Sequence, residues 1–596
     1  MFFLPTTRVP KDGEDGSISE NVNEIVNDDA NEIIDDMIND DANETIDDDS
    51  ANQKQKNFCD LSKDNITSTR LRSRNYLNLV YFQQKCESQN PPKNYFEISK
   101  RHDHELWTAA YLKEENKLRE KGRMSLVPTP KHVEPIKLLE LFNYKFDNSS
   151  NEKIAKCRFV ARGDLIEKKQ EDIYAPVAAT PVIRLFIAVA AMKNYELHQA
   201  DVVNAFLNGS LKQPVYLQLP KRLRQKHPNC CWKTTSSIYG LPESPKRWHN
   251  EMDTFLKNQG FKPCPVQTCL YVYNRHNISL FLLLYVDDIL YMGSDNQIVK
   301  EFEMKLKNRF EIKMKSIAES FVGLEIEYQK DAIVLHQVKQ IKKLLETFEM
   351  QDSKETTTPM EHMLVIPETK QPLQNIKLFQ SIVGGLLYVN IGSRPEISYA
   401  INQLSKKMKN PSKEDLNYAK RVLRYLAHNE KFGIKFKTNV ETATIEMHVD
   451  AEHGRHENGK AVYGYCIKFN GGPVFFKTKK EPLVTTSSCE AEFLALSESS
   501  KQLMYLKNLL NFMGVQYHRP KMLNDNVGAI KIAKSAAAVQ RTKHLNLRFF
   551  KIREYLENNE FELSYVKSEL NEADGFTKAL GRNKFQFYKG CMVAEV

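Results

Sequence analysis

The chain has 596 residues, of which 41% are hydrophobic and 27% charged, and its formal net charge at pH 7 is +9. This length exceeds what one hydrophobic core usually serves, so we expect two or three globular units with appendages. Ten cysteines, with no CxxC pair and no Cys/His run at zinc spacing, exclude a disulfide scaffold and favour a reduced, intracellular protein. The N-terminus lacks a secretion-signal pattern and no apolar run approaches membrane length, so we expect no membrane partner.

The beginning of the chain is strongly acidic. Residues 11–50 hold sixteen Asp or Glu side chains and one basic residue, and the motif at residues 27–32 returns at residues 39–44. The few apolar side chains here bury too little surface to offset the conformational entropy that the chain would lose on folding. We therefore predict an acidic disordered tail at residues 1–65 and a linker at residues 66–95. The tail is either a solvated spacer or a mimic of nucleic acid that shields the basic remainder.

That remainder is basic. Outside residues 11–50 the chain has 84 basic and 60 acidic residues, a net charge of +24. An excess of this size suits a polyanionic partner, of which nucleic acid is the obvious one. Many soluble proteins carry excess lysine without binding a polyanion, so the charge alone does not identify the partner.

Globular sequence begins near residue 96. Apolar spacing predicts three helices in the first two thirds of the chain, at residues 104–121, 182–192 and 296–310. Strands are predicted at residues 157–162, from residue 198 to a turn at Asn208-Gly209, and at residues 321–326. From residue 445 the pattern becomes strand-rich α/β, with strands at residues 447–451 and 522–524, a helix from residue 487 and a last helix from residue 571.

The apolar run at residues 281–291 is interrupted by Asp287 and Asp288. Its two halves predict the strands of a half-buried hairpin, with the acids at the bend. Two carboxylates beside that much apolar surface lose hydration and repel each other unless a cation or strong donors meet them. A polar hairpin tip is the alternative interpretation. One pair is too few to hold a divalent ion firmly, and Asp201 is the candidate third acid.

Several blocks in a fixed order make the chain resemble the reverse transcriptase of Ty/copia-class long-terminal-repeat retrotransposons. They include Tyr285-Val286-Asp287-Asp288 and lie at residues 161–163, 174–177, 201–209, 238–248, 285–288, 321–326, 380–388, 394–400 and 420–426. The acids of the C-terminal part, with blocks at residues 541–548 and 565–566, resemble the RNase H domain of the same element class. The resemblance covers residues 104–584 and implies the C-terminal part of a longer Pol polyprotein.

The resemblance implies an α+β and α/β multidomain fold. A reverse transcriptase right hand would have its fingers and palm at residues 96–350 and a helical thumb and connection at residues 351–440. An RNase H-like α/β domain would follow at residues 441–584, and a C-terminal tail at residues 585–596.

For the polymerase, the resemblance implies two Mg²⁺ ions, with Mn²⁺ as the substitute, held by acids on adjacent palm strands. Neighbouring strand residues point to opposite faces, so we expect Asp287 to be the direct ligand beside Asp201, with Asp288 in support. The remaining implied site residues contact the nucleotide and the nascent base pair: Phe206 as a steric gate against ribonucleotides, Gly240 at a close backbone approach, and Lys156, Arg158 and Arg162 as candidates for the triphosphate. A core aromatic is the alternative interpretation of Phe206.

For the nuclease, the resemblance implies a second pair of metal ions held by Asp450, Glu492, Asp525 and Asp574. Taken singly, each acid would be a surface or capping residue, which is how we interpret Glu490 and Glu572. Selectivity for a hybrid would come from contacts with the 2′-hydroxyls of the RNA strand, for which Asn526 and Arg541 are candidates.

The implied partners are an RNA template, a DNA or tRNA primer, an RNA/DNA hybrid, dNTPs and other Gag and Pol products, and the implied location is a cytoplasmic virus-like particle or the nucleus. Two positions depart from the family pattern. Pro242-Glu243 replaces Lys-Gln, and Glu452-His453 replaces Asp-Trp after Ala451. The rival hypotheses are a truncated, non-catalytic nucleic-acid-binding relic and a polymerase without nuclease activity.

Overall fold

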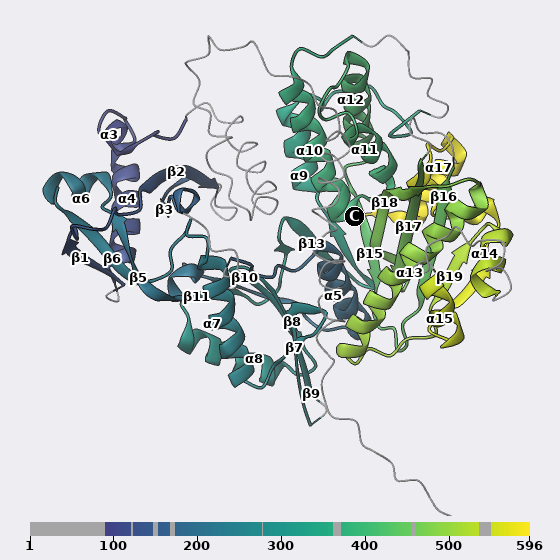
Figure 1. Cartoon of the computed structure of the whole chain (residues 1–596), viewed down its shortest axis with the longest axis horizontal. Helices are drawn as coiled ribbons and strands as arrows, with labels where there is room; N and C mark the ends of the chain where they lie inside the picture. Colours follow the sequence, from purple (N-terminus) through teal and green to yellow (C-terminus); the bar gives the residue numbers. More distant parts are fainter. Residues whose placement is uncertain are drawn as a thin grey trace, which may run out of the picture.

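The computed structural model describes residues 90–120, 123–146, 153–166, 173–276, 278–361, 371–453, 460–535 and 550–596. The predicted acidic tail, most of the predicted linker and Arg541 lie outside these residues. The described residues form a mixed α/β structure with several β-sheets (Figure 1). Within these ranges every helix is too short or too polar to cross a membrane.

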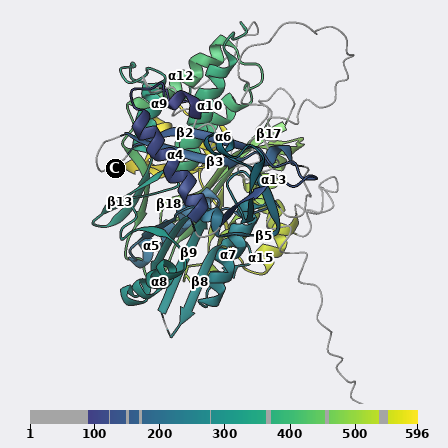
Figure 2. The same cartoon turned by 90° about the vertical axis from the view of Figure 1, so that its left-hand side faces the viewer.

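The N-terminal part packs two small sheets against the helix α4 (His104–Arg119), which lies beside β2 and β3 (Figure 2). The strands pair as β1-β6-β5 and β2-β3. In β3, Cys157 and Phe159 face the buried Trp107 of α4, whereas Lys156 and Arg158 alternate onto the outer face. The elements of this part are α3 (Tyr95–Ile98), β1 (Met124–Pro128), β2 (Leu138–Phe146), β3 (Lys153–Ala161), η3 (Gly163–Leu165), β5 (Ser210–Gln218), α6 (Lys221–Lys226) and β6 (Cys230–Ser236).

A six-stranded sheet of order β11-β4-β10-β9-β8-β7 follows. Its strands are β4 (His198–Val202), β7 (Lys262–Cys264), β8 (Gln267–Arg275), β9 (Ile278–Tyr285), β10 (Asp288–Gly293) and β11 (Ile312–Lys315). One face packs on α7 (Ser244–Asn258) and α8 (Asn296–Arg309), and the other on α5 (Thr180–Lys193). The helices predicted at residues 182–192 and 296–310 are confirmed.

A second sheet, here called the bridging sheet, has the order β12-β13-β14-β15-β21. Its strands are β12 (Ser320–Phe321), β13 (Leu324–Gln329), β14 (Ala332–His336), β15 (Phe432–Lys437) and β21 (Ala594–Glu595). Helices α9 (Val338–Thr347), α10 (Ile376–Ser393), α11 (Ser398–Ser405) and α12 (Lys413–Ala427), with η6 (Pro395–Ile397), lie between β14 and β15 in the sequence.

The single strand predicted at residues 321–326 is wrong. Phe321 pairs with Leu324 across an antiparallel hairpin, and the two residues between them form its turn. Val322 and Gly323 both have positive φ, +49° and +76°, which is the backbone of a tight two-residue turn. A β-branched residue in that conformation is not expected from local preference, so the turn escaped the sequence pattern.

The C-terminal sheet has the order β18-β17-β16-β19-β20. Its central strand β16 pairs antiparallel with β17 and parallel with β19, and the long helix α13 packs on it. The elements are β16 (Ile445–Glu452), β17 (Lys460–Phe469), β18 (Gly472–Val484), α13 (Ser488–Phe512), β19 (Lys521–Asn524), α14 (Val527–Lys534), α15 (Lys551–Glu557), β20 (Glu562–Tyr565), η9 (Ser568–Leu570), α16 (Asp574–Thr577) and α17 (Arg582–Met592).

Residues 585–596, predicted as a tail, are ordered. They contain most of α17, whose Phe585, Tyr588 and Met592 are buried, and β21, which pairs with β15. The predicted last helix, α16, is only four residues long and is followed by α17. Apolar side chains at helical spacing bury against the cluster formed by α9, α10, α11 and α12, which is why this segment is not solvated.

One apolar cluster runs through most of the molecule. It begins in α5 and the six-stranded sheet, continues through the bridging sheet and ends in the C-terminal sheet with α13. The sheet that carries Asp201 and the sheet that carries Asp450 are therefore joined by continuous packing.

Candidate active sites

Asp287 lies in a two-residue turn that joins β9 to β10. Tyr285 pairs with Asp288 on either side of the turn, and Val286 adopts φ = +57°. Positive φ is a genuine outlier for a β-branched residue, and such strain persists only where the surroundings impose it. The indole Nε1–H of Trp248 on α7 donates a 2.6 Å hydrogen bond to the carbonyl oxygen of Val286, which holds the turn from below.

The register of β4 and β10 brings the three acids of this part together. Asp201 is directly opposite Asp288, and the backbone N–H of Val202 donates to the carbonyl oxygen of Asp287 at 2.9 Å. Residues directly opposite on antiparallel strands share a face of the sheet. The predicted hairpin with the acids at its bend is confirmed. The alternation along a strand from which we chose Asp287 over Asp288 does not apply, because Asp287 is in the turn and Asp288 is the cross-strand neighbour of Asp201.

The pKa values of Asp287 and Asp288 are raised, as expected for carboxylates that lie close together. Partial burial, with the charges of Asp287 and Asp201, raises the pKa of Asp288 to about 7. Burial also raises the pKa of Asp287, helped by the charge of Asp201 and opposed by Arg158 and Lys156. Gln199, two residues before Asp201 on β4, donates to Asp288 at 3.5 Å. A cation bound between these carboxylates would relieve their mutual repulsion, which contributes to the raised pKa values.

The cations of β3 lie near these acids. The guanidinium of Arg158 stacks over the ring of Tyr239 at 5.0 Å, and that ring packs edge-on against the half-buried Phe206, with centroids 4.7 Å apart. Lost hydration, with the charges of Arg158 and Lys145, lowers the pKa of Lys156 to about 8. Its side chain is nevertheless exposed, so it stays reachable. Arg162 is ion-paired with Asp164 at 2.8 Å.

The backbone around position 240 requires a glycine. Its φ is +93°, and a Cβ there would lie 2.0 Å from the carbonyl oxygen of Ala161. The neighbouring N–H of Ala161 donates to the carbonyl oxygen of Tyr239 at 2.7 Å, so this loop is fastened to β3. The unusual acid Glu243 is ion-paired with Arg247 at 2.7 Å, which offsets its charge.

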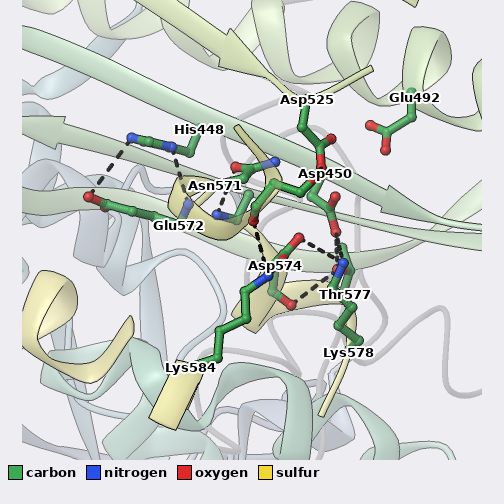
Figure 3. A network of polar contacts seen from close by, with 12 residues as sticks. His448, Asp450, Glu492, Asp525, Asn571, Glu572, Asp574, Thr577, Lys578 and Lys584 are labelled. Carbon is green, nitrogen blue, oxygen red and sulfur yellow. Dashed lines mark hydrogen bonds and ion pairs between the residues drawn. The ribbon is translucent and has the colours of Figure 1, made fainter. Parts of the chain in front are cut away.

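In the C-terminal sheet three of the four predicted acids converge. Asp450 on β16, Asp525 after β19 and Asp574 at the start of α16 each offer a carboxylate oxygen within 4.8 Å of the other two (Figure 3). Asp450 and Asp574 are buried. Oxygen ligands from several carboxylates suit hard divalent cations, so the donor set fits a metal such as Mg²⁺.

Glu492, the fourth predicted acid, stands to one side of this group (Figure 3). The side-chain amide of Asn524 donates to its carboxylate at 2.8 Å. Burial and the charge of Asp450 raise the pKa of Glu492 well above its usual range. Burial likewise raises the pKa of Asp450 to about 7, with Lys578 opposing the shift and Asp574 adding to it.

Two asparagines fix the loops that carry the acids. The amides of Asn524 and Asn571 both donate to the carbonyl oxygen of Val449, at 3.1 Å and 3.0 Å. Val449 immediately precedes Asp450, while Asn524 immediately precedes Asp525. The carbonyl oxygen of Val449, next to Asp450, thus accepts hydrogen bonds from a residue next to Asp525 and from a residue three positions before Asp574.

Sequence reasoning missed three further residues of this site (Figure 3). The hydroxyl of Thr577 donates to Asp450, and the ammonium of Lys578 lies 2.8 Å from Asp574 and 3.8 Å from Asp450. Lys584 also pairs with Asp574. The spacing of Asp574 and Lys578, four residues apart, is a local signal from which this ion pair could have been predicted.

Glu490 and Glu572, which we interpreted as surface or capping residues, have partners outside the group of Asp450, Asp525 and Asp574. Glu490 accepts from the backbone N–H of Thr486 at 2.7 Å, at the start of α13. Glu572 is ion-paired with Lys468 at 2.9 Å. Asn526, a candidate for contact with a hybrid, accepts from the backbone N–H of Ala529 and thereby caps α14.

Comparisons with known proteins agree with this geometry. The family described as "Reverse transcriptase (RNA-dependent DNA polymerase)" matches residues 122–362. The Retrovirus-related Pol polyprotein from transposon TNT 1-94 of Nicotiana tabacum is 30% identical over 499 residues, which cover 80% of this chain and 37% of that protein. The Putative transposon Ty5-1 protein of Saccharomyces cerevisiae is 30% identical over 304 residues, which cover 50% of this chain and 98% of that protein.

Residues 122–362 thus form a reverse transcriptase domain. The chain belongs to the Pol proteins of copia-type retrotransposons. It spans about a third of the length of the first curated relatives that it matches, at 37%, 32% and 32%. Among solved structures, the foamy virus protease-reverse transcriptase aligns over 87% of this chain and 63% of its own with 13% identity and a TM-score of 0.25, which is too low to bear on the assignment.

Proposed function

We propose that this chain is an RNA-directed DNA polymerase with a fused RNase H, which copies element RNA into DNA and degrades the RNA of the resulting hybrid. The observation that carries the proposal is the register of β4 and β10, which sets Asp201 opposite Asp288 and beside the turn of Asp287. A second carboxylate group at Asp450, Asp525 and Asp574 supports the nuclease half.

In the polymerase site, Asp201 and Asp287 would hold Mg²⁺, or Mn²⁺ as the substitute, with Asp288 in support. When bound, paired divalent ions stabilise the charge that develops on the entering and leaving oxygens of nucleotidyl transfer. The protein's own part is to fix the carboxylates. Trp248 holds the carbonyl of Val286, and the N–H of Val202 holds that of Asp287, so the acids keep their places as the nucleic acid moves.

The incoming dNTP would lie between β3 and the Asp287 turn. Arg158 and Lys156 are near enough to Asp287 to oppose the rise of its pKa, so a triphosphate that reaches the acids also meets these cations. Phe206, which packs edge-on against Tyr239, would exclude a 2′-hydroxyl. Arg162, already paired with Asp164, is the weakest of the three candidates for the triphosphate.

In the nuclease site, Asp450, Asp525, Asp574 and Glu492 would hold the divalent ions that activate water against an RNA phosphodiester. The chain's own residues orient these acids: Thr577 donates to Asp450, Asn524 to Glu492, and Ser568 to Asp525 at 2.5 Å. Lys578 and Lys584 offset part of the negative charge that three close carboxylates create.

The domain division that follows assigns residues 96–350 to fingers and palm, 351–440 to thumb and connection, and 441–584, extended by α17, to the nuclease. The partners would be an RNA template, a DNA or tRNA primer, an RNA/DNA hybrid and other Gag and Pol products. The site of action would be a cytoplasmic virus-like particle, with a nuclear location as the alternative.

Purified protein with Mg²⁺ tests the proposal. We expect primer extension on an RNA template, lost in Asp287→Asn, and cleavage of a labelled RNA/DNA hybrid, lost in Glu492→Gln, with each variant retaining the other activity. Extension without cleavage in the wild-type protein would indicate a polymerase without nuclease. A folded wild-type protein with neither activity would contradict the proposal and favour a nucleic-acid-binding relic.

A further inference from the structure

Arg184 on α5 is a buried cation at the meeting point of three parts of the chain. Its side chain is 1% exposed and is among the largest fully buried side chains of the described residues. Figure 1 shows α5 near β15 and β18, between the six-stranded sheet and the C-terminal sheet. Helix α5 packs on β14 and β15 of the bridging sheet and on β18. A charge is rarely buried so deeply unless its partners hold it in place.

The partners of Arg184 come from the other two parts. Its Nε–H donates to the carbonyl oxygen of Val474 on β18 at 2.8 Å. Its Nη1 donates to the carbonyl oxygens of Ile391 and Gly392, which belong to the last turn of α10. A helix C-terminus leaves carbonyl groups without intrahelical partners and favours a positive charge, so Arg184 caps α10 from outside the helix.

The guanidinium also stacks on an aromatic side chain. Its carbon lies 4.3 Å from the ring centroid of Phe476 on β18, a distance typical of a cation–π contact. Guanidinium suits this position because its planar fork donates in several directions while one face stays free for stacking, which an ammonium cannot do.

From Arg184 short routes lead to both candidate active sites. Helix α5 ends at Lys193, and β4, the strand that carries Asp201, begins at His198. On the other side, Phe476 packs against Phe576 with centroids 6.2 Å apart, and the hydroxyl of Thr478 donates to the carbonyl oxygen of Phe576 at 2.7 Å. Phe576 belongs to α16, the helix that begins at Asp574.

We infer that Arg184 is a positioning residue that sets the spacing between the polymerase and nuclease sites on one bound hybrid. The inference rests on the proposed function. The side chain of Arg184 adds directed polar contacts to the apolar packing between the helix that precedes the strand of Asp201 and the strand that supports the helix of Asp574. The nuclease therefore cuts RNA at a defined distance behind the primer end held by the polymerase.

The test uses the full chain on a hybrid of labelled RNA with a chain-terminated DNA primer and the next complementary dNTP, which keeps the primer end in the polymerase site. The wild-type protein is expected to cut the RNA within a narrow window at one distance from the primer end. Arg184→Met is expected to spread the cuts over at least twice as many positions, while extension on a primed RNA template stays within about threefold of wild type.

Two further variants separate positioning from general damage. Arg309→Met removes a half-exposed arginine whose partner, Glu251, lies in the same part of the chain, and it should leave the cutting window unchanged. Phe476→Leu keeps an apolar side chain but removes the stacking partner of Arg184, and it should broaden the window less than Arg184→Met.

Scanning calorimetry gives a readout that does not require activity. We expect one cooperative unfolding transition for the wild-type chain and two separated transitions for Arg184→Met, because the substitution removes the buried hydrogen bonds and the stacking contact that Arg184 makes between the two halves. A folded Arg184→Met with the wild-type cutting window would overturn the inference. If the wild type shows neither activity, the proposed function fails and, with it, the inference about cleavage spacing. In that case, unfolding of Arg184→Met in one transition would also exclude Arg184 as the link between the halves.

Discussion

Val286 shows at the scale of one residue how the polymerase site is held. Its φ of +57° is unfavourable for a β-branched side chain, at a cost on the order of 1–3 kcal/mol for such a residue. The hydrogen bond from Trp248 to its carbonyl oxygen holds the peptide in this orientation. The strained turn places Asp288 opposite Asp201 of β4, with Asp287 next to it in the chain.

Trp248→Phe should therefore impair polymerisation more than folding. Loss of one hydrogen bond lowers the free energy of unfolding by only about 0.5–1.5 kcal/mol. We expect primer extension to fall by about tenfold or more, because small displacements of reacting groups are costly, and hybrid cleavage to change by less than about twofold. Trp232→Phe, a buried tryptophan of the N-terminal part, is the matched control. Equal extension by the two variants would contradict this role.

The lowered pKa of Lys156 predicts that dNTP binding depends on pH. Its pKa is lowered to about 8, so the ammonium is charged at pH 7 and increasingly neutral as the pH rises above 8. We expect the KM for dNTP to rise between pH 7 and pH 9 in the wild type. Lys156→Arg should show a flat profile, because guanidinium stays charged throughout this range. Steady-state extension at each pH measures the difference, and parallel profiles would remove Lys156 from the triphosphate site.

Phe206→Ala should admit ribonucleotides. The ring packs on Tyr239 and is half-buried, so its removal opens space where a 2′-hydroxyl would lie. We expect the preference for dNTP over rNTP, measured as the ratio of kcat/KM values, to fall by at least about tenfold. Phe206→Tyr serves as the control because it keeps the ring. Unchanged discrimination in Phe206→Ala would assign the ring to the core.

Carboxylates could be singled out from the sequence because few side chains suit divalent ions, and their positions follow recognisable blocks. The roles of Trp248, Thr577 and Asn571 could not be predicted, because each acts through a partner that is distant in the sequence. The pairing of Asp201 with Asp288 depends on a register that local alternation does not specify. The position of Asp287 at the bend was predicted correctly, whereas alternation along one strand could not show which acid lies opposite Asp201.

At the scale of elements, the helices were predicted more reliably than the turns. Helices α5 and α8 have apolar positions at a clear helical period, and the structure confirms both. The hairpin of β12 and β13 was read as one strand because Val322, at φ = +49°, is a residue that favours strands. The contact of Tyr388 with Val322 comes from α10, 66 positions later, and it explains what local preference cannot.

Helix α17 with β21 gives a prediction at the same scale. A chain ending at residue 584 loses Phe585, Tyr588 and Met592, each of which is buried. Burial of such a side chain contributes about 1.5–3 kcal/mol, so we expect a clear fall in Tm and in soluble yield. Thermal unfolding of the full and shortened chains measures the loss. A shortened chain with the wild-type Tm would show that the segment does not contribute to the core.

For the whole molecule, the sequence indicated separate units and the structure joins them. The boundaries at residues 350 and 440 follow the family resemblance, yet β15 pairs with β14 on one side and with β21 on the other. Pairing between residues a hundred positions apart leaves no trace in local composition, so the bridging sheet was not foreseen. The shared core predicts that the proposed polymerase and nuclease domains unfold in one transition. Calorimetry of Arg184→Met tests how far this joint unfolding depends on Arg184.

The carbonyl oxygen of Val449 has a consequence for how the nuclease responds to distortion. One of its hydrogen bonds comes from Asn524, which ends β19 just before Asp525, and the other from Asn571, three residues before Asp574, while its own strand carries Asp450. If β16 slides, all three carboxylates are carried along with it, and their triangle keeps its dimensions. Drift of the C-terminal sheet relative to a bound hybrid would therefore change where the cut falls before it changes how fast the bond is broken.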